Sequence, residues 1–252
     1  MDYFVKPDSI VRQIWRDADC ILFIFGASSG EFAPHKSVDW LFFTGKLPSD
    51  PIGRLFSTVV YAQKIIFEEK SKAEKTLQNM KNIHVGVENN RGFEIPNWAY
   101  QDVLYMLIYH SMASFERLHR TLTLSEKKEI FEVFHEVGNR MGISDLPKNL
   151  EDWEIDRKEN LKENYQKTEL SSQLFQAYKT HLGSIRFQLL LYVQRILLPI
   201  ELKRLTGNFS SPNHNILMYS YKRTKTYWPI HQLKYYLLPK KYRKTLKDLV
   251  RS

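Results

Sequence analysis

The chain has 252 residues, 43% of them hydrophobic, which suits one large domain or two small ones with a full core, so intrinsic disorder is not expected. Its only cysteine, Cys20, excludes an internal disulfide and suits a reducing compartment. The net charge of +9 lies entirely in residues 222–252, where ten Lys or Arg residues accompany one acid.

The N-terminal stretch MDYFVKPDSIVRQIW has no basic region followed by an apolar run, so we expect no signal peptide. The stretch CILFIFGA is too short to span a bilayer. Arg and Gln residues interrupt IRFQLLLYVQRILLPI, which is typical of a buried or interfacial helix. We therefore predict a cytoplasmic protein.

Helix signals follow one another along the chain. Ser9 is expected to cap a first segment that ends near Phe23, and the Gly- and Pro-containing residues 24–50 are expected to form a structured loop. A helix should begin after Asp50, with Pro51 at its first position. Further helices are expected over residues 71–87, 97–119, 123–142, 156–181 and 184–206. No window shows sustained alternation, so we predict no strands.

These elements predict an all-α fold, a single globular domain of roughly eight helices that spans residues 1–252. The basic and aromatic tail, residues 222–252, should pack on this domain or extend from it. Its composition leaves three interpretations: a solvated helix face, peripheral contact with an anionic membrane, or contact with nucleic acid, which is the least favoured.

Three polar residues stand out on the two helices that follow Asp50. Arg54 and Thr58 are one helical turn apart, where a guanidinium and a hydroxyl could face water or an anion in a cavity. His84 falls on the same helical arc as Ala73, Leu77 and other apolar residues, on or beside the buried face. Such an imidazole is either a hydrogen-bonded core histidine or a metal ligand.

Four motifs in order extend this pattern. They are DPIGRLFST, then IHVGV, then the apolar helix LYMLIYHSMASFERL, then LSEKKEIFEVFHEVGNRMGISDLP; the later LLPIELKRLTG also fits. Over about residues 9–153 this arrangement resembles the latex-clearing-protein (rubber oxygenase) family, which includes the MpaB-type oxygenases. Two positions depart from the family pattern: Ser57 stands where those proteins carry a Lys, and Glu88 where many carry an Arg.

The resemblance implies an all-helical haem b protein with its pocket between helices. His84 would be the proximal ligand to iron, leaving the opposite position for dioxygen. Arg54 would neutralise a propionate, Thr58 would donate to one or line the distal side, and His110 would line the pocket. The substrate would be a hydrophobic, isoprenoid- or lipid-like small molecule. Catalytic residues stay unassigned.

Two alternatives remain at this point. The chain could be a non-catalytic haem-binding or helical interaction protein. Less favoured is a di-iron carboxylate protein, because Glu116–His119 and Glu132–His135 both match the Glu-x-x-His spacing of such sites. Across a helical hairpin these two motifs would lie roughly 12 Å apart along the axis, too far to share a metal pair.

Overall fold

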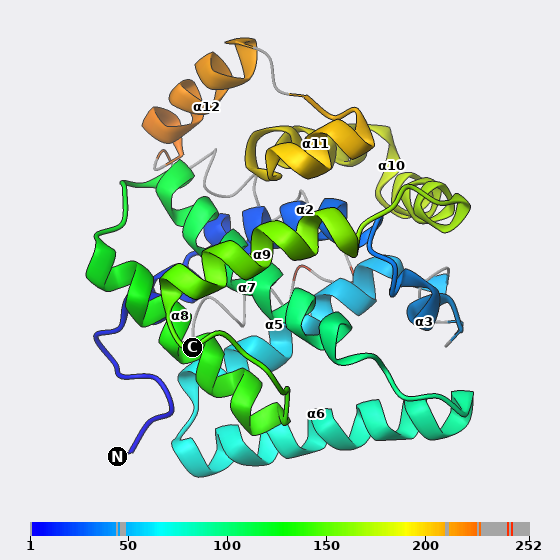
Figure 1. Ribbon diagram of the computed structural model, residues 1–252. Helices are drawn as coiled ribbons and strands as arrows, with labels where there is room; N and C mark the ends of the chain where they lie inside the picture. The colour runs from blue at the N-terminus through cyan, green and yellow to red at the C-terminus, as the bar shows by residue number, and fades with distance from the viewer. Residues whose placement is uncertain are drawn as a thin grey trace.

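A computed structural model describes residues 2–43, 45, 49–209, 212–225, 227, 241 and 243. These residues form eleven α-helices and no extended strand, which confirms the predicted all-α class (Figure 1). The helices are α1 Ile10–Arg16, α2 Ala18–Phe32, α3 Val38–Phe43, α5 Pro51–Phe67, α6 Lys70–Arg91, α7 Asn97–Leu118, α8 Leu124–Met141, α9 Leu150–Glu163, α10 Glu169–Leu197, α11 Ile200–Thr206 and α12 Pro212–Thr224.

Helix α2 is the central element, packed against α1, α5, α7 and α10. Thirteen of its 15 residues are buried, which explains why it is apolar on almost every side. Gly26 and Gly30 let α10 approach closely, because a Cβ at either position would meet Val193 or Gln194 within about 3 Å. The prediction of a loop from residue 24 is therefore wrong: these glycines serve helix packing and do not break the helix.

The capping signals place most helix boundaries correctly. The Ser9 side chain accepts a hydrogen bond from the Val11 amide at the start of α1, and Thr123 and Glu126 form a reciprocal capping box at the start of α8. Helix α8 ends at Gly142, which adopts a left-handed conformation (φ 80°). The predicted break near residue 183 appears as a kink at Gly183 inside α10.

The predicted helix over residues 156–181 is wrong, because the chain leaves α9 after Glu163 and begins α10 at Glu169. Backbone groups of this connection pair with the segment after α2. The Lys36 amide donates to the carbonyl of Asn164, and the Gln166 amide donates to the carbonyl of Pro34. These tertiary hydrogen bonds satisfy backbone groups that a continuous helix would have used internally.

Helices α5 and α6 form an antiparallel hairpin joined at Glu68 and Glu69. Arg54 lies 14 residues before Glu68 and His84 lies 15 residues after Glu69. At 1.5 Å per residue both lie roughly 21 to 23 Å from the turn. The hairpin therefore places Arg54 and His84 at similar distances from the turn.

The two halves of α6 differ in how they are covered. Its buried residues are Ala73, Thr76 and Leu77, and none lies after Leu77. Ile83 is 52% exposed and Val85 is 44% exposed, and α6 runs along one edge of the molecule (Figure 1). The half of α6 that carries His84 is therefore largely uncovered, and Ile83 and Val85 are exposed apolar side chains on it.

No helix in the described part of the chain is both long and apolar enough to cross a bilayer. Of the basic tail, residues 222–252, only positions 222–225, 227, 241 and 243 are described, and the first of these complete α12. The rest of the predicted tail lies outside the described residues.

Candidate cofactor site

His84 is a half-buried histidine without a hydrogen bond in the described structure. Its Nδ1 is buried and has no partner, and the ring of Tyr100 from α7 lies against it at 5.2 Å between centroids. Burial lowers the pKa of His84, the charge of Arg54 lowers it further, and Glu88 acts in the opposite direction. At neutral pH the imidazole is therefore uncharged, the form that binds a metal.

A cavity of about 160 Å³ opens beside His84. It lies between α6, the start of α7 and the end of α8, and is lined by Lys81, His84, Val85, Glu88, Tyr100, Met141, Gly142 and Ile143. It is smaller than a typical cofactor pocket of about 300 to 1,000 Å³. A large ligand here would also have to cover exposed surface of α6.

Arg54 lies in the first turn of α5, and its charge acts on His84. Its guanidinium donates to the hydroxyl of Ser57 at 3.1 Å, and no carboxylate among the described residues pairs with it. Burial lowers the pKa of Arg54, which remains charged because the ordinary value is far above neutrality. Thr58 lies one turn further along α5 and is partly buried. A partly desolvated cation without an acid is an incomplete anion site.

A haem group would need a ligand nitrogen and a cation for its propionates, and the residues present could supply both. Within the described residues His84 has no hydrogen-bond partner and Arg54 has no paired carboxylate. The exposed side chains of Ile83 and Val85 on α6 offer apolar surface that a porphyrin would bury. The charge of Arg54 acts on His84 across the hairpin, whereas Arg54 and Thr58 do not line the cavity beside His84.

His110 lies in a different environment, deep in the core. Its Nε2 donates to Glu31 at 2.8 Å, and Glu31 also accepts hydrogen bonds from Arg157 and Tyr165 at 3.0 Å. Glu31 and His110 are both fully buried. Within the described chain His110 makes no polar contact with His84. The Nδ1 atom of His110 is buried and has no hydrogen-bond partner there.

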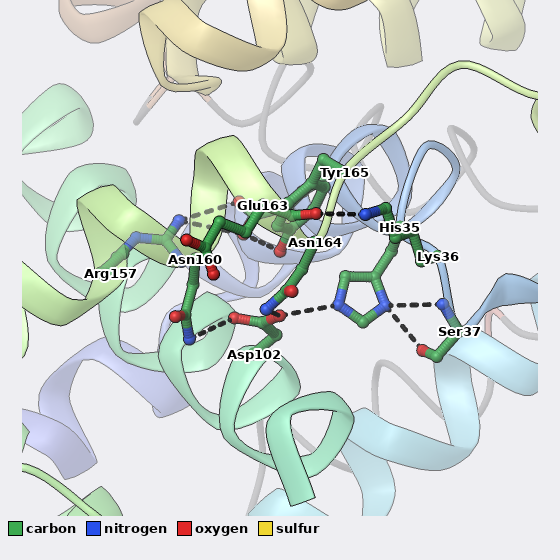
Figure 2. Close-up of polar contacts among 10 residues, drawn as sticks. His35, Lys36, Ser37, Asp102, Arg157, Asn160, Glu163, Asn164 and Tyr165 are labelled. Atoms are coloured by element: carbon green, nitrogen blue, oxygen red, sulfur yellow. Dashed lines mark hydrogen bonds and ion pairs between the residues drawn. The ribbon is translucent and has the colours of Figure 1, made fainter. Parts of the chain in front are cut away.

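Asp102 extends this buried polar network toward the connection after α2 (Figure 2). It accepts hydrogen bonds from His35 at 3.0 Å, Asn160 at 2.9 Å and Asn164 at 2.7 Å. The other ring nitrogen of His35 faces the amide and the hydroxyl of Ser37, which makes that nitrogen an acceptor. Serine, histidine and aspartate are thus hydrogen-bonded in a row, but Ser37 is buried and lines neither the cavity beside His84 nor the cavity of about 290 Å³ beside Pro34.

Electrostatics support a structural role for this network. Burial alone would raise the pKa of Glu31, but the charge of Arg157 and the hydrogen bond from His110 hold it at about 2. Burial also raises the pKa of Tyr165, with the charge of Glu31 adding to the effect. The network joins α2, α7 and α9 through a buried ion pair.

The Glu-x-x-His motifs are not brought together. Glu116 pairs with Lys127 at 3.1 Å, His119 pairs with Asp17 at 2.7 Å, and His135 contacts Asn139 at 3.1 Å. Among the described residues the one group of three metal-ligating side chains is Asp17, Cys20 and His119. Asp17 is already engaged there, because it caps α2 and pairs with His119. The described structure gives no support to a di-iron centre.

Apart from His84, the residues that line this cavity were not predicted as site residues, and two of them, Glu88 and Tyr100, act directly on His84. Glu88 follows His84 by one helical turn, so helix periodicity could have placed it on the same face. Tyr100 comes from another helix, and no local pattern connects it with His84.

Comparison with known proteins bears on the activity. Searches of curated proteins and of solved structures return no match to this chain. One family model matches residues 40–246, which is 207 of the 252 residues, and its description is ER-bound oxygenase mpaB/B'/Rubber oxygenase, catalytic domain. The match confirms the predicted resemblance and includes Arg54, Thr58, His84 and His110. The chain therefore belongs to the mpaB/rubber oxygenase catalytic-domain family and is an oxygenase, an oxidoreductase enzyme.

Proposed function

We propose that this oxygenase depends on haem b and acts on a hydrophobic, isoprenoid- or lipid-like small molecule. One observation carries the proposal: within the described residues neither ring nitrogen of His84 has a hydrogen-bond partner and no carboxylate pairs with Arg54, whose charge acts on His84 across the α5–α6 hairpin. Buried polar groups are normally hydrogen-bonded, and buried charges are normally paired. A single group with a metal and carboxylates would bind one ring nitrogen of His84 and pair with Arg54.

In this proposal each residue has one task. His84 binds the iron, Arg54 neutralises a propionate, and Thr58 donates to a propionate or lines the distal side. Bound haem supplies the binding and activation of dioxygen. His110 is retained as a predicted pocket residue only through its free Nδ1, because Nε2 is committed to Glu31.

The apolar surface near His84 supports a hydrophobic substrate. Ile83 and Val85 on α6 are about half exposed, as is Phe43 of α3, which lies against Arg91 at the end of α6. Arg91 also pairs with Asp39 at 2.7 Å, so α3 is fixed to this end of α6. Exposed apolar side chains beside a cofactor would hold and orient a lipophilic molecule and exclude water.

The proposal is tested by supplying haem during expression and recording the absorption spectrum of the purified protein. Wild type should show a Soret band, and His84→Ala should lose or strongly shift it. The matched control is His135→Ala, which removes a histidine whose polar partner is Asn139 on its own helix. An identical Soret band in wild type and His84→Ala contradicts the ligand assignment.

A second measurement separates an oxygenase that uses haem from one that does not. The haem-loaded protein is incubated with an isoprenoid alkene under oxygen, and oxygenated products are identified by mass spectrometry. Products are expected from wild type and not from His84→Ala. Equal product from both variants would mean that the oxygenase uses another site.

We also propose that the chain contacts anionic membranes peripherally through its basic tail. Ile216, Leu217 and Tyr219 of α12 are more than half exposed immediately before the ten bases of residues 222–252. Replacing the Lys and Arg residues after position 230 with Gln should reduce co-sedimentation with anionic liposomes. Unchanged co-sedimentation would exclude the tail as the membrane contact.

A further inference from the structure

We propose that Glu88, held in place by Tyr100, is the anionic positioning partner of His84. It would fix the imidazole ring and increase its electron donation to a bound iron. This inference rests on the proposed haem site. It concerns a role that the family match does not assign.

Glu88 is anchored from two directions. Its Oε1 accepts a hydrogen bond from the Tyr100 hydroxyl at 3.0 Å and another from the Ile95 amide at 2.9 Å. These contacts join the last turns of α6 to the connection before α7 and to α7 itself. The carboxylate is thus held by the backbone and by a side chain of the neighbouring segment.

Tyr100 connects the carboxylate to the histidine. Its hydroxyl donates to Glu88, while its ring lies against the His84 ring with an interplanar angle of 58°. Burial and the hydrogen bond to Glu88 raise the pKa of Tyr100, so its hydroxyl stays protonated as a donor. The Glu88–Tyr100 contact therefore restricts where the His84 ring can turn.

The free atoms of the two side chains are complementary. His84 and Glu88 are one helical turn apart, both line the same cavity, and Glu88 is the only acid among the residues that line it. His84 Nδ1 has no partner, and Glu88 Oε2 makes no hydrogen bond within the described residues. A histidine that binds a metal almost always donates its second N–H to a carboxylate, carbonyl or water.

Charge near the site supports the same assignment. Lys81 also lines the cavity, but its side chain is exposed and faces the Gly142 turn. The charge of Arg54 on α5 lowers the pKa of His84 and so opposes the effect of Glu88. A carboxylate beside a ligand histidine makes it a stronger donor, which stabilises the more highly charged iron and lowers its reduction potential.

The experiment compares Glu88→Gln with wild type in the full-length, haem-loaded protein. Gln keeps an oxygen acceptor for Tyr100 and Ile95 but removes the charge. We expect haem affinity to fall about tenfold, the reduction potential measured by spectroelectrochemistry to rise, and the g values of the ferric protein to change. Tyr100→Phe, which keeps the ring but removes one of the two hydrogen bonds that hold the carboxylate, should shift the potential in the same direction by less.

The matched control is Glu94→Gln, which removes an exposed acid six residues along the chain that does not line the cavity. It should leave the potential and the g values as in wild type. If Glu88→Gln folds, binds haem and keeps the wild-type potential, Glu88 is only a structural anchor and the inference fails alone. If wild type binds no haem, the proposed function and this inference both fail.

Discussion

His84 and His110 were predicted for the same pocket, and the fold gives them opposite surroundings. His110 is fully buried at the centre of the molecule and donates to a carboxylate that two further residues also hold. His84 is half-buried at an edge, and its Nδ1 has no partner within the described residues. The core histidine is part of a nearly complete network, whereas the edge histidine is not.

This difference distinguishes polar side chains that stabilise the fold from polar side chains that are free to bind a ligand. A satisfied buried network contributes to stability and specifies one packing arrangement. An unpartnered group costs free energy in the ligand-free protein and recovers it on binding. Unfolding measurements should therefore reveal the core network, and cofactor titration should reveal the edge site.

The largest expected effect is on the buried polar network that contains His110 and Glu31. Glu31→Gln leaves the Arg157 guanidinium buried without an anion, which should lower the free energy of unfolding by about 3 to 5 kcal/mol in urea titrations. The double variant with Arg157→Met should lose less than the sum of the single variants. Strict additivity would mean that the two side chains do not act as a pair.

The same carboxylate predicts a pH dependence. The pKa of Glu31 is held at about 2 instead of its ordinary 4.5, so its contribution is fully present above about pH 4.5 and is lost as pH falls toward 2. Unfolding free energies measured between pH 2 and 6 should fall more steeply in wild type than in Glu31→Gln, and parallel curves would refute this.

Replacing each of the two histidines in turn should change the free energy of unfolding by less than Glu31→Gln does. Without haem, His110→Ala should cost about 2 to 3 kcal/mol, because it removes a donor to Glu31 and leaves a void. His84→Ala should change the stability by less than about 1 kcal/mol, since its ring makes no hydrogen bond in the described structure. Equal costs in thermal or chemical unfolding would remove the distinction.

The smallest effect is expected at Arg54. In the haem-free protein, Arg54→Met should be neutral or stabilising by up to about 1 kcal/mol, because an unpaired, partly buried cation is replaced by an apolar chain. Haem should raise the melting temperature of this variant less than that of wild type. Lys64→Met, at an exposed position on the same helix, should keep the full haem-induced increase.

Local signals in the sequence were enough for most of the helix ends. Ser9, the Thr123–Glu126 pair and Gly142 act through neighbours three or four residues away, so the sequence shows them directly. Arg54, Thr58 and His84 likewise fall within one hairpin. Gly26 and Gly30 misled the prediction because their role depends on α10, more than 160 residues later.

Long-range polar pairs could not be predicted in the same way. Glu31 and Arg157 are 126 residues apart, and Asp102 meets Asn164 from 62 residues away. The hydrogen bonds beyond the end of α9 join residues 34–36 to residues 164–166. The sequence near Glu163 therefore carries no local signal that the helix ends there. Only the assembled packing of α2, α7 and α9 determines these contacts.

The hairpin between α5 and α6 also limits how this chain could change in length. One residue inserted within either helix would turn everything beyond it by about 100° and would move His84 away from Arg54. The two connecting residues, Glu68 and Glu69, are outside both helices, so extra residues there would leave each helical face intact. Substitutions can therefore accumulate along these helices, whereas insertions and deletions are tolerated only at the turn.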